Sequence, residues 1–401
     1  MIFDVVIAGG GAVGLASAAL LNDAGYSVCV LEPRLARTFP SGPTELRTFA
    51  LTPAVRRLLE LARAWGELDH TRIGRFDAMD VWDACSSGHL RFEPPPGHRG
   101  AMGYIVEQQN LVAALAASLA TRPGVSLQSQ SLQTLEAGQP ATVVSDAGTR
   151  LRARLVIGAD GAGSRVREAL AIEHAREPYG QSAVVCNVRL DTPHGQVARQ
   201  RFLPTGPLAA LPLAGPRDCA IVWSLHDVEA ATTMTLDDEA FAAALGAAFE
   251  QRLGAVLEVG ARAAFPLSRA RAARMVHGNC VLLGDAAHLM HPLAGQGLNL
   301  GLMDVATLVE CLGAPGATPW PPAAALRRFE RWRKSETLAM LAVVDGLHHL
   351  FQRQEAPVRR LRGLGMQLTD RFAPLKHLLI GHAMGTAGDV PALLRAPSAA
   401  G

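Results

Sequence analysis

The residues whose types and spacing could best support chemistry lie in one stretch, GDAAHLMHPLAGQGLNLGLMD, at positions 284–304. It holds His288, His291 and Asp285 directly after an apolar run, so it could form a metal site, a phosphate-binding turn or a polar loop. The two histidines are three residues apart with no glutamate between them, unlike the H-E-x-x-H motif of zinc enzymes. We therefore expect no metal here, and the choice between the other two interpretations depends on the rest of the chain.

A second glycine-rich stretch opens the chain. The apolar run 3–8 predicts a buried parallel strand, and Gly9, Gly11 and Gly14 follow it as G-x-G-x-x-G. Gly9 permits a tight turn, Gly11 lets the backbone approach a pyrophosphate, and Gly14 lets the following helix pack against the strand. The helix expected over 12–24 begins with Ala12 and Val13 and directs its amides and dipole at that phosphate.

An acidic residue completes this dinucleotide-binding pattern. The second strand, expected over 27–31, ends at Glu32, eighteen residues beyond Gly14. A carboxylate at this point accepts the hydroxyls of an adenosine ribose and disfavours a 2′-phosphate. The pattern therefore predicts FAD or NAD in this site rather than NADP.

Two further stretches repeat the order of strand, turn and helix. In 154–170, Asp160 and Gly161 end an apolar strand, and Ser164 follows in the turn. In 278–312, a strand over 280–283 ends at Gly284-Asp285, and a helix is expected over 297–312. An ordinary strand, turn and helix with an aspartate cap is the structural alternative for the second stretch. Ser164, near Asp160 and with only a distant histidine, is a poor candidate for a nucleophilic triad.

Together the three motifs resemble those of the flavin-dependent aromatic monooxygenases of the para-hydroxybenzoate hydroxylase type. That resemblance implies FAD as the cofactor, with NAD(P)H as reductant and O2 as oxidant through a C4a-hydroperoxide of the flavin. By analogy Asp285 holds the ribitol, and the start of the helix that follows it faces the ring, where Pro292 and Gly295 form the flavin environment without an assigned acid or base. The residues implied to bind the cofactor are Gly9, Gly11, Ala12, Val13, Gly14, Glu32, Arg47, Gln108, Asp160, Gly161, Asp285, Pro292, Gly295, Gln296, Gly297, Leu298 and Asn299.

Within this class, HPLAGQGLNLGLMD at 291–304 is similar to the signature of the ubiquinone-biosynthesis hydroxylases. RFLPTGPLAALPL at 201–213 and RRFERWRKSETLAM at 327–340 also resemble that subfamily. Glu45 replaces an aspartate that the family often shows before Arg47, and Gln108 stands where many relatives have asparagine, with Gln109 as the alternative register. Both replacements keep the hydrogen-bonding type.

The expected fold class is α/β, with a Rossmann-like FAD-binding domain interleaved with a mostly β-sheet substrate domain and followed by a helical C-terminal region. We expect the FAD domain to comprise 1–73, 97–180 and 266–340, the substrate domain 74–96 and 181–265, and the helical region 341–401. Strand-length runs rich in valine, isoleucine and aromatic residues support the sheet after position 181. The alanine-rich segment 239–249 suggests a surface helix.

Composition limits the partners. The 38 basic and 36 acidic residues leave a net charge of +2, which does not favour nucleic acid as a ligand. The six cysteines form no CxxC pair and predict free or buried thiols. With no signal-like start and no long apolar run, we expect a cytoplasmic protein.

The C-terminal tail leaves two interpretations open. Leu338, Leu341, Val344, Leu347 and Phe351 recur at helical spacing after the basic stretch 326–334. Such a helix could pack on the FAD domain with a solvated basic face, or it could contact a partner or the inner face of the cytoplasmic membrane, where prenylated substrates dissolve. The oligomeric state stays open.

The sequence thus predicts an enzyme that hydroxylates the aromatic ring of a polyprenyl phenol in ubiquinone biosynthesis. Two alternatives remain: a hydroxylase of a small non-prenylated aromatic compound, and a non-catalytic FAD- or lipid-binding accessory protein of a quinone-synthesis complex. The carbon that is hydroxylated, the prenyl length and the choice of NADH or NADPH are not predicted.

Overall fold

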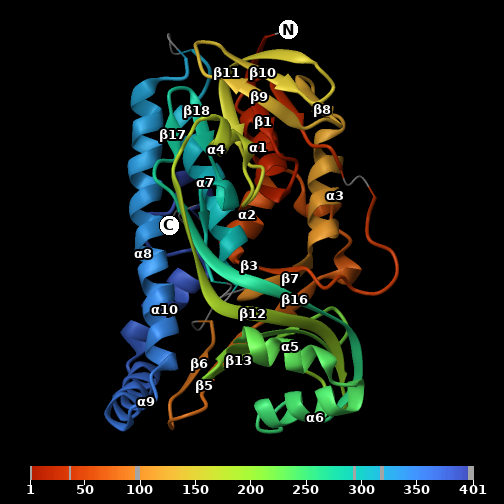
Figure 1. The fold of residues 1–401 in the computed structure, drawn as a ribbon, viewed down its shortest axis with the longest axis vertical. Coiled ribbons are helices and arrows are strands. Elements are labelled where there is room, and N and C mark those ends of the chain that lie inside the picture. Colours follow the sequence, from red (N-terminus) through yellow and green to blue (C-terminus); the bar gives the residue numbers. More distant parts are fainter. Residues whose placement is uncertain (1, 36–37, 95–99, 292–294, 317–319, 396–401) are drawn as a thin grey trace, which may run out of the picture.

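Two large β-sheets form the frame of the molecule (Figure 1). The computed structural model describes residues 2–35, 38–94, 100–291, 295–316 and 320–395. The α/β fold class predicted from the sequence is confirmed, because a mainly parallel sheet with helices lies above a mainly antiparallel sheet in Figure 1.

The first sheet carries the three motifs. Its main path runs β17-β18-β11-β1-β2-β8, and β10 and β9 extend from β11. β1 pairs in parallel with both β2 and β11, and β11 pairs in parallel with β18, so three motif strands end at one edge. The bounds are β1 (Ile2–Ala8), β2 (Val28–Leu31), β8 (Val125–Gln128), β9 (Leu132–Glu136), β10 (Ala141–Ser145), β11 (Arg150–Gly158), β17 (Val276–His277) and β18 (Cys280–Leu282).

Helices cover this sheet because its central strands are apolar on both faces. Every residue of β2 is buried, and Val5, Val6 and Ile7 of β1 have no exposed surface. The helices that supply the core on this side are α1 (Ala12–Asp23), α3 (Gln108–Leu119), α4 (Arg165–Ala169) and α7 (Gln296–Leu312). The strand and helix predicted around each glycine motif are confirmed within one or two residues.

The second sheet runs β19-β16-β12-β15-β14-β13-β5-β6. β12 (His174–Leu190) and β16 (Val256–Ala272) are long antiparallel partners within this sheet, and one end of the pair extends up toward the FAD-side layer (Figure 1). The expected domain boundaries at 180/181 and 265/266 therefore fall inside continuous strands. The other strands are β5 (Ala78–Asp83), β6 (His89–Phe92), β13 (Val197–Leu203), β14 (Gly206–Pro212), β15 (Asp218–His226) and β19 (His288–Leu289).

Two helices cover the lower side of this sheet, α5 (Asp227–Thr235) and α6 (Asp238–Ala248). The interpretation of 239–249 as a surface helix is only half right. Phe241, Leu245 and Phe249 have no exposed surface and pack with Val184, because one face of the helix carries large apolar side chains between the alanines.

A small sheet, β3-β7-β4, connects the two layers, and short helices accompany it. Its strands are β3 (Thr48–Leu51), β4 (Gly74–Phe76) and β7 (Gly103–Glu107). Around them lie α2 (Pro53–Leu61), η1 (Trp65–Glu67) and η2 (His70–Arg72). Arg72 forms an ion pair with buried Glu107 at 2.7 Å, which anchors the end of β7 where α3 begins.

The C-terminal region is helical, as predicted. α8 (Ala323–Gln352) spans the height of the molecule, and α9 (Ala356–Arg371), α10 (Ala373–Ala383) and η5 (Ala392–Leu394) follow it (Figure 1). Among the described residues, no helix combines the length and the apolar character that a bilayer crossing requires. The basic stretch is not simply a solvated face, because Phe329 and Arg333 are buried.

Candidate functional site

The glycine turn between β1 and α1 has the shape expected for a dinucleotide. A Cβ atom at Gly14 would lie 1.9 Å from the carbonyl oxygen of Gly9, and one at Gly9 would lie 2.3 Å from the carbonyl oxygen of Ala159. Gly9 also has φ +103°, which favours glycine. At Gly11, by contrast, a Cβ would meet no atom within 4 Å in the part of the chain that the structure describes, so this part of the turn is open to a ligand.

Glu32 lies beside the same turn at the end of β2. Its Oε2 accepts a hydrogen bond from the amide of Gly10 at 2.9 Å, and Oε1 accepts one from Arg34 at 3.0 Å. These bonds hold the carboxylate next to the start of α1, and each oxygen keeps a second acceptor position. Ala12 and Val13 form the first turn of that helix.

The second motif contributes an incompletely satisfied carboxylate. Asp160 Oδ2 accepts hydrogen bonds from the amides of Arg165 at 2.8 Å and Val166 at 3.2 Å, whereas buried Oδ1 has no partner among the described residues. Burial raises the pKa of Asp160. Gly161 follows with φ +78°. The sequence suggested an aspartate cap for this helix; Asp160 does accept from its first amides, but the N-cap residue is Ser164, which accepts from the amide of Arg167 at 3.1 Å.

The three motifs contact one another directly. Arg167 donates to the carbonyl of Ala286 at 3.0 Å, which joins the second motif to the third. A Cβ at Gly301 would lie 3.0 Å from both Gly284 Cα and Val13 Cγ2, so α7 packs closely on the first motif. The backbone elements that would hold the cofactor therefore support each other.

The third motif turns at η3 (Gly284–Ala286), and α7 starts after a left-handed residue. Gly295 precedes the helix with φ +63°, and Gln296, Gly297 and Leu298 form its first turn. A Cβ at Gly297 would meet no atom of the described residues within 4 Å, so the amides at this end are approachable from that part of the chain. Pro292, predicted to lie at the flavin ring, is outside the described residues.

Asn299 has a role that the sequence did not indicate. Its Oδ1 accepts from the amide of Thr52 at 3.0 Å, and its Nδ2 donates to the carbonyls of Ala50 at 2.8 Å and Gly295 at 3.0 Å. Both hydrogens of the side-chain amide are used within the protein, and Oδ1 accepts one bond, so the side chain ties β3 and α2 to the start of α7. For hydrogen-bond donation to a cofactor, only the backbone amide of Asn299 remains.

Arg47 and Asp285 bring opposite charges to this region. Burial raises the pKa of Asp285, and the charges of His288 and then Arg47 act in the opposite direction. The carbonyl of Arg47 accepts from the amide of Gln108 at 3.0 Å, so the loop before β3 meets the start of α3. Gln109, the alternative register, donates from its side chain to the carbonyl of Thr38 at 3.1 Å.

Asp304, His288 and Arg333 form a buried group next to the third motif, which we call the Asp304 cluster. Asp304 accepts hydrogen bonds from the amide of Gly284 at 2.9 Å, from His288 Nε2 at 2.7 Å and from Arg333 Nε at 2.7 Å. Burial acts to raise the pKa of Asp304, but the charges of His288 and Arg333 outweigh it and the pKa is lowered. Sequence reasoning recognised Asp304 only as part of a signature and missed Arg333, since the pair joins two helices through residues that are 29 positions apart.

His291 lies in a different environment from His288. It is fully buried against Tyr179 and His348, with ring centroids 5.0 and 5.2 Å away. Gln181 Nε2 donates to the carbonyl of Thr205 at 2.6 Å, which leaves its Oε1 facing His291 Nε2 at 3.3 Å. His291 Nε2 therefore carries the hydrogen, and Nδ1 has no partner among the described residues.

Burial, and next the neighbouring His348, lowers the pKa of His291 to about 4, so the ring is neutral at physiological pH. The two histidines of the opening motif thus face separate partners, Asp304 and Gln181. Within the described residues, no group of three or more histidine, cysteine, aspartate or glutamate side chains is arranged to hold a metal ion.

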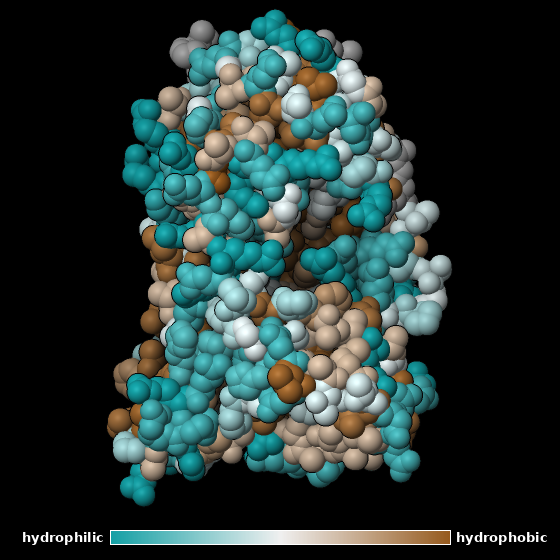
Figure 2. All heavy atoms as spheres, in the orientation of Figure 1, coloured by the Kyte–Doolittle hydropathy of each residue, from teal (hydrophilic) through white to brown (hydrophobic). Residues whose placement is uncertain are grey.

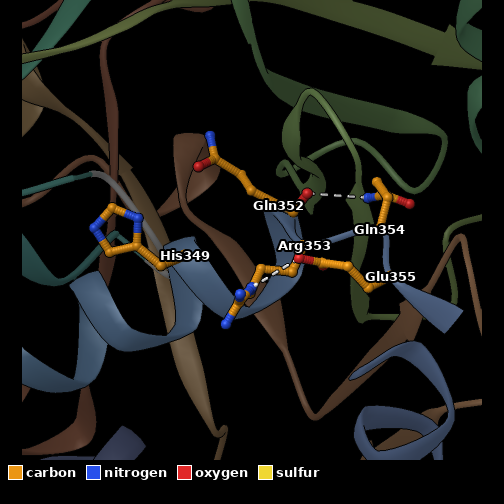
Figure 3. A pocket seen from close by; sticks show the side chains of 5 residues that line it. All are labelled: His349, Gln352, Arg353, Gln354 and Glu355. Carbon is orange, nitrogen blue, oxygen red and sulfur yellow. Dashed lines mark hydrogen bonds and ion pairs between the residues drawn. The ribbon is translucent and has the colours of Figure 1, made fainter. Parts of the chain in front are cut away.

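The surface is hollowed between the two sheets. Figure 2 shows a recess at mid-height, with apolar residues in its depth, between the FAD-side layer above and the antiparallel sheet below. A separate open hollow lies at the end of α8, lined by His349, Gln352, Arg353, Gln354 and Glu355 (Figure 3). That lining is polar and comes from none of the three motifs, so we do not assign the reaction to it.

The residues around the three motifs fit FAD. Open backbone at Gly11, the approachable start of α7 and the unpartnered Oδ1 of Asp160 are the features that a long, phosphate-containing cofactor would satisfy. When bound, FAD supplies the electron transfer and the activation of dioxygen. The protein has to bind it, orient an aromatic ring and exclude water from the recess.

Comparison with known proteins agrees with this geometry. The FAD binding domain family matches residues 3–318, and the chain belongs to that family. The p-nitrophenol 4-monooxygenase PnpA of Pseudomonas putida has the same fold, with a TM-score of 0.76 over 97% of this chain and 99% of that one, at 18% identity. Family and fold together show an FAD-binding protein with the fold of the flavin-dependent monooxygenases.

Full-length relatives place the chain among ubiquinone hydroxylases. It is 38% identical to ubiquinone hydroxylase UbiL of Rhodospirillum rubrum, over 96% of this chain and 90% of that protein. It is 31% identical to the 3-demethoxyubiquinol 3-hydroxylase of Escherichia coli, over 95% and 98%. The mouse ubiquinone biosynthesis monooxygenase COQ6 is 32% identical over 95% and 91%.

Proposed function

We propose that this enzyme hydroxylates the aromatic ring of a polyprenyl phenol intermediate of ubiquinone biosynthesis, with NAD(P)H as reductant and O2 as oxidant. The observation that carries the proposal is similarity along the whole chain to proteins named for ubiquinone hydroxylation, the C-terminal helices included. A shared FAD domain alone would not favour this substrate, since unrelated aromatic substrates occur on the same fold.

We assign the cofactor contacts residue by residue. Backbone at Gly9, Gly11, Ala12, Val13 and Gly14 would hold the pyrophosphate, and Glu32 the adenosine ribose. Asp285 and Arg47 would lie at the ribitol and phosphates, with Asp160, Gly161 and Gln108 nearby. Amides from Gly295 to Asn299 would face the pyrimidine edge of the ring, where negative charge develops on reduction.

No side chain is assigned as a catalytic acid or base. Electrophilic oxygen transfer requires an oriented, electron-rich phenol and a dry site, which the recess between the sheets supports. Pro292 and Gly295 would shape the ring environment rather than exchange protons.

The partners follow from the substrate. A polyprenyl phenol is insoluble in water, so we propose peripheral contact with the inner face of the cytoplasmic membrane, and association with other enzymes of quinone synthesis. The surface that would make the membrane contact is argued in the next subsection.

Complementation tests this proposal. The gene is expressed in bacterial strains that each lack one ubiquinone ring hydroxylase, and quinones are analysed by mass spectrometry. Restored ubiquinone in one strain would support the proposal and identify the carbon. Failure in every strain, with folded FAD-loaded protein present, would contradict it and direct attention to a small aromatic substrate.

A further inference from the structure

The C-terminal helices expose apolar side chains out of proportion to the rest of the molecule. Of the sixteen large apolar side chains that are exposed among the described residues, eleven lie between 338 and 379. They are Leu338, Val343, Leu347, Leu350, Leu361, Leu364, Leu368, Phe372, Leu375, Leu378 and Leu379, which we call the C-terminal apolar face. Apolar residues gather on the lower left edge of Figure 2, where α8 and α9 lie in Figure 1.

Helix α9 shows that this exposure is not incidental. Leu361, Leu364 and Leu368 recur at helical spacing and are 70%, 56% and 65% exposed. The opposite side of the helix buries Arg362, which forms two hydrogen bonds to buried Asp83 at 2.8 and 3.0 Å. Surface helices usually bury their leucines and expose their arginines, and α9 does the opposite. Its exposed leucines therefore indicate a contact with an apolar surface outside this chain.

Charge indicates the chemistry of that partner. Residues 353–382 contain six arginine or lysine residues and only two acidic ones, Glu355 and Asp370. Both acids are paired, Glu355 with Arg353 at 3.3 Å and Asp370 with Lys376 at 2.7 Å. Arg360 and Arg371 flank the leucines, are exposed and have no ion-pair partner among the described residues. Leucines between free arginines match a bilayer with anionic headgroups.

Helix α10 connects this face with the small sheet β3-β7-β4. Leu375, Leu378 and Leu379 are exposed, whereas Ile380 and Met384 are buried against Phe76, Met102 and Ile105 of the small-sheet region. The chain then returns to the cofactor side, where the carbonyl of Met384 accepts from the amide of Ala54. One helix therefore lies both in the apolar face and beside the elements that position the site.

We propose that the C-terminal apolar face docks the enzyme on an anionic lipid bilayer. This inference rests on the proposed function, because a prenylated phenol is dissolved in the bilayer and the enzyme must reach it there, whereas a small water-soluble substrate gives no reason for docking. The leucines of α9 and the exposed side of α10 enter the headgroup region, and the flanking arginines contact lipid phosphates.

Vesicle flotation of the full-length, FAD-loaded protein tests this docking. Wild type is expected to float with phosphatidylcholine–phosphatidylglycerol vesicles and much less with phosphatidylcholine alone. The triple change Leu361→Gln, Leu364→Gln, Leu368→Gln should weaken binding about tenfold or more, since burial of one leucine is worth about that factor. The pair Arg360→Glu, Arg371→Glu should remove the preference for the anionic vesicles.

The matched control changes apolar residues that are equally exposed elsewhere. Val228→Gln, Leu257→Gln replaces side chains that are 80% and 58% exposed on α5 and β16, and should float like wild type. Wild type that stays unbound with both vesicles would overturn the proposal. So would a wild-type dimer in light scattering that the triple glutamine variant converts to monomer, because the face would then be a contact between two copies.

Flotation requires no turnover, so the two proposals fail separately. Protein that floats but hydroxylates no prenyl phenol contradicts only the proposed function. Protein that hydroxylates a short-chain phenol but binds no vesicle contradicts only the docking.

Discussion

At the scale of single residues, the glycines of the first motif have separable roles. Gly14 has no room for a side chain, whereas Gly11 has room that we assign to the cofactor. Two substitutions of the same size should therefore fail in different ways.

We expect Gly14→Ala to destabilise the protein by about 2 kcal/mol or more, because its Cβ would press on the Gly9 carbonyl. Gly11→Ala should leave the unfolding of the cofactor-free protein almost unchanged and lower the affinity for FAD about tenfold or more. Urea unfolding and flavin fluorescence titration measure the two effects. Unchanged FAD binding in Gly11→Ala would mean that the open space is not the pyrophosphate site.

His291 supplies a pH prediction. Burial lowers its pKa from 6.5 to about 4, so the folded protein binds a proton less readily than the unfolded chain. The stability that comes from the neutral ring is complete above about pH 6.5 and is lost as the pH falls from there toward 4. Between about pH 7.5 and pH 5, wild type should lose roughly 2 kcal/mol more than His291→Asn. Denaturant unfolding at both pH values checks this, and parallel losses in the two proteins would contradict the buried neutral histidine.

At the scale of elements, the Asp304 cluster joins η3, α7 and α8 behind the cofactor motif. A buried charge pair contributes little when intact, but removing one partner leaves the other charge uncompensated. The geometry of η3 should therefore depend on a helix that begins almost twenty residues after Asp304.

Asp304→Asn should cost about 3–5 kcal/mol because Arg333 stays buried without its counter-charge. Adding Arg333→Met should recover part of that loss. As a control, Glu93→Gln breaks an exposed pair with Arg91 and should change stability by less than about 1 kcal/mol. Thermal or denaturant unfolding measures the loss of stability in each variant. If Glu93→Gln lost as much stability as Asp304→Asn, the cluster would have no special role.

The helices and strands of the three motifs could be predicted from the sequence, but the contacts between distant elements could not. The strand, turn and helix of each motif were predictable because hydrophobic period, glycine and cap residues act within about fifteen residues of one another. Two contacts were not predictable: the hydrogen bond from the Thr52 amide to Asn299, and the ion pair between Arg333 and Asp304. Each depends on packing between distant segments. The spacing of the apolar residues in 338–379 predicted helices, but it could not predict which of these residues are buried. Val344 and Phe351 are buried, whereas Leu361 and Leu368 are exposed.

At the scale of the whole molecule, a recess lies between two sheets, and a C-terminal helix that carries part of the exposed apolar face also packs against residues of the small sheet and of the antiparallel sheet. This arrangement brings together a cofactor layer, a substrate layer and a surface suited to lipid. The hydroxylation of a bilayer-borne phenol is the activity that uses all three.

The most direct test is turnover of the FAD-loaded protein with NADPH or NADH, a prenylated phenol in anionic vesicles and isotopically labelled dioxygen. We predict phenol-stimulated oxidation of the nicotinamide and a product whose ring carries one oxygen atom from the labelled gas. Nicotinamide oxidation that the phenol does not stimulate, or a recovered phenol without labelled oxygen, would contradict the assignment as a polyprenyl phenol hydroxylase.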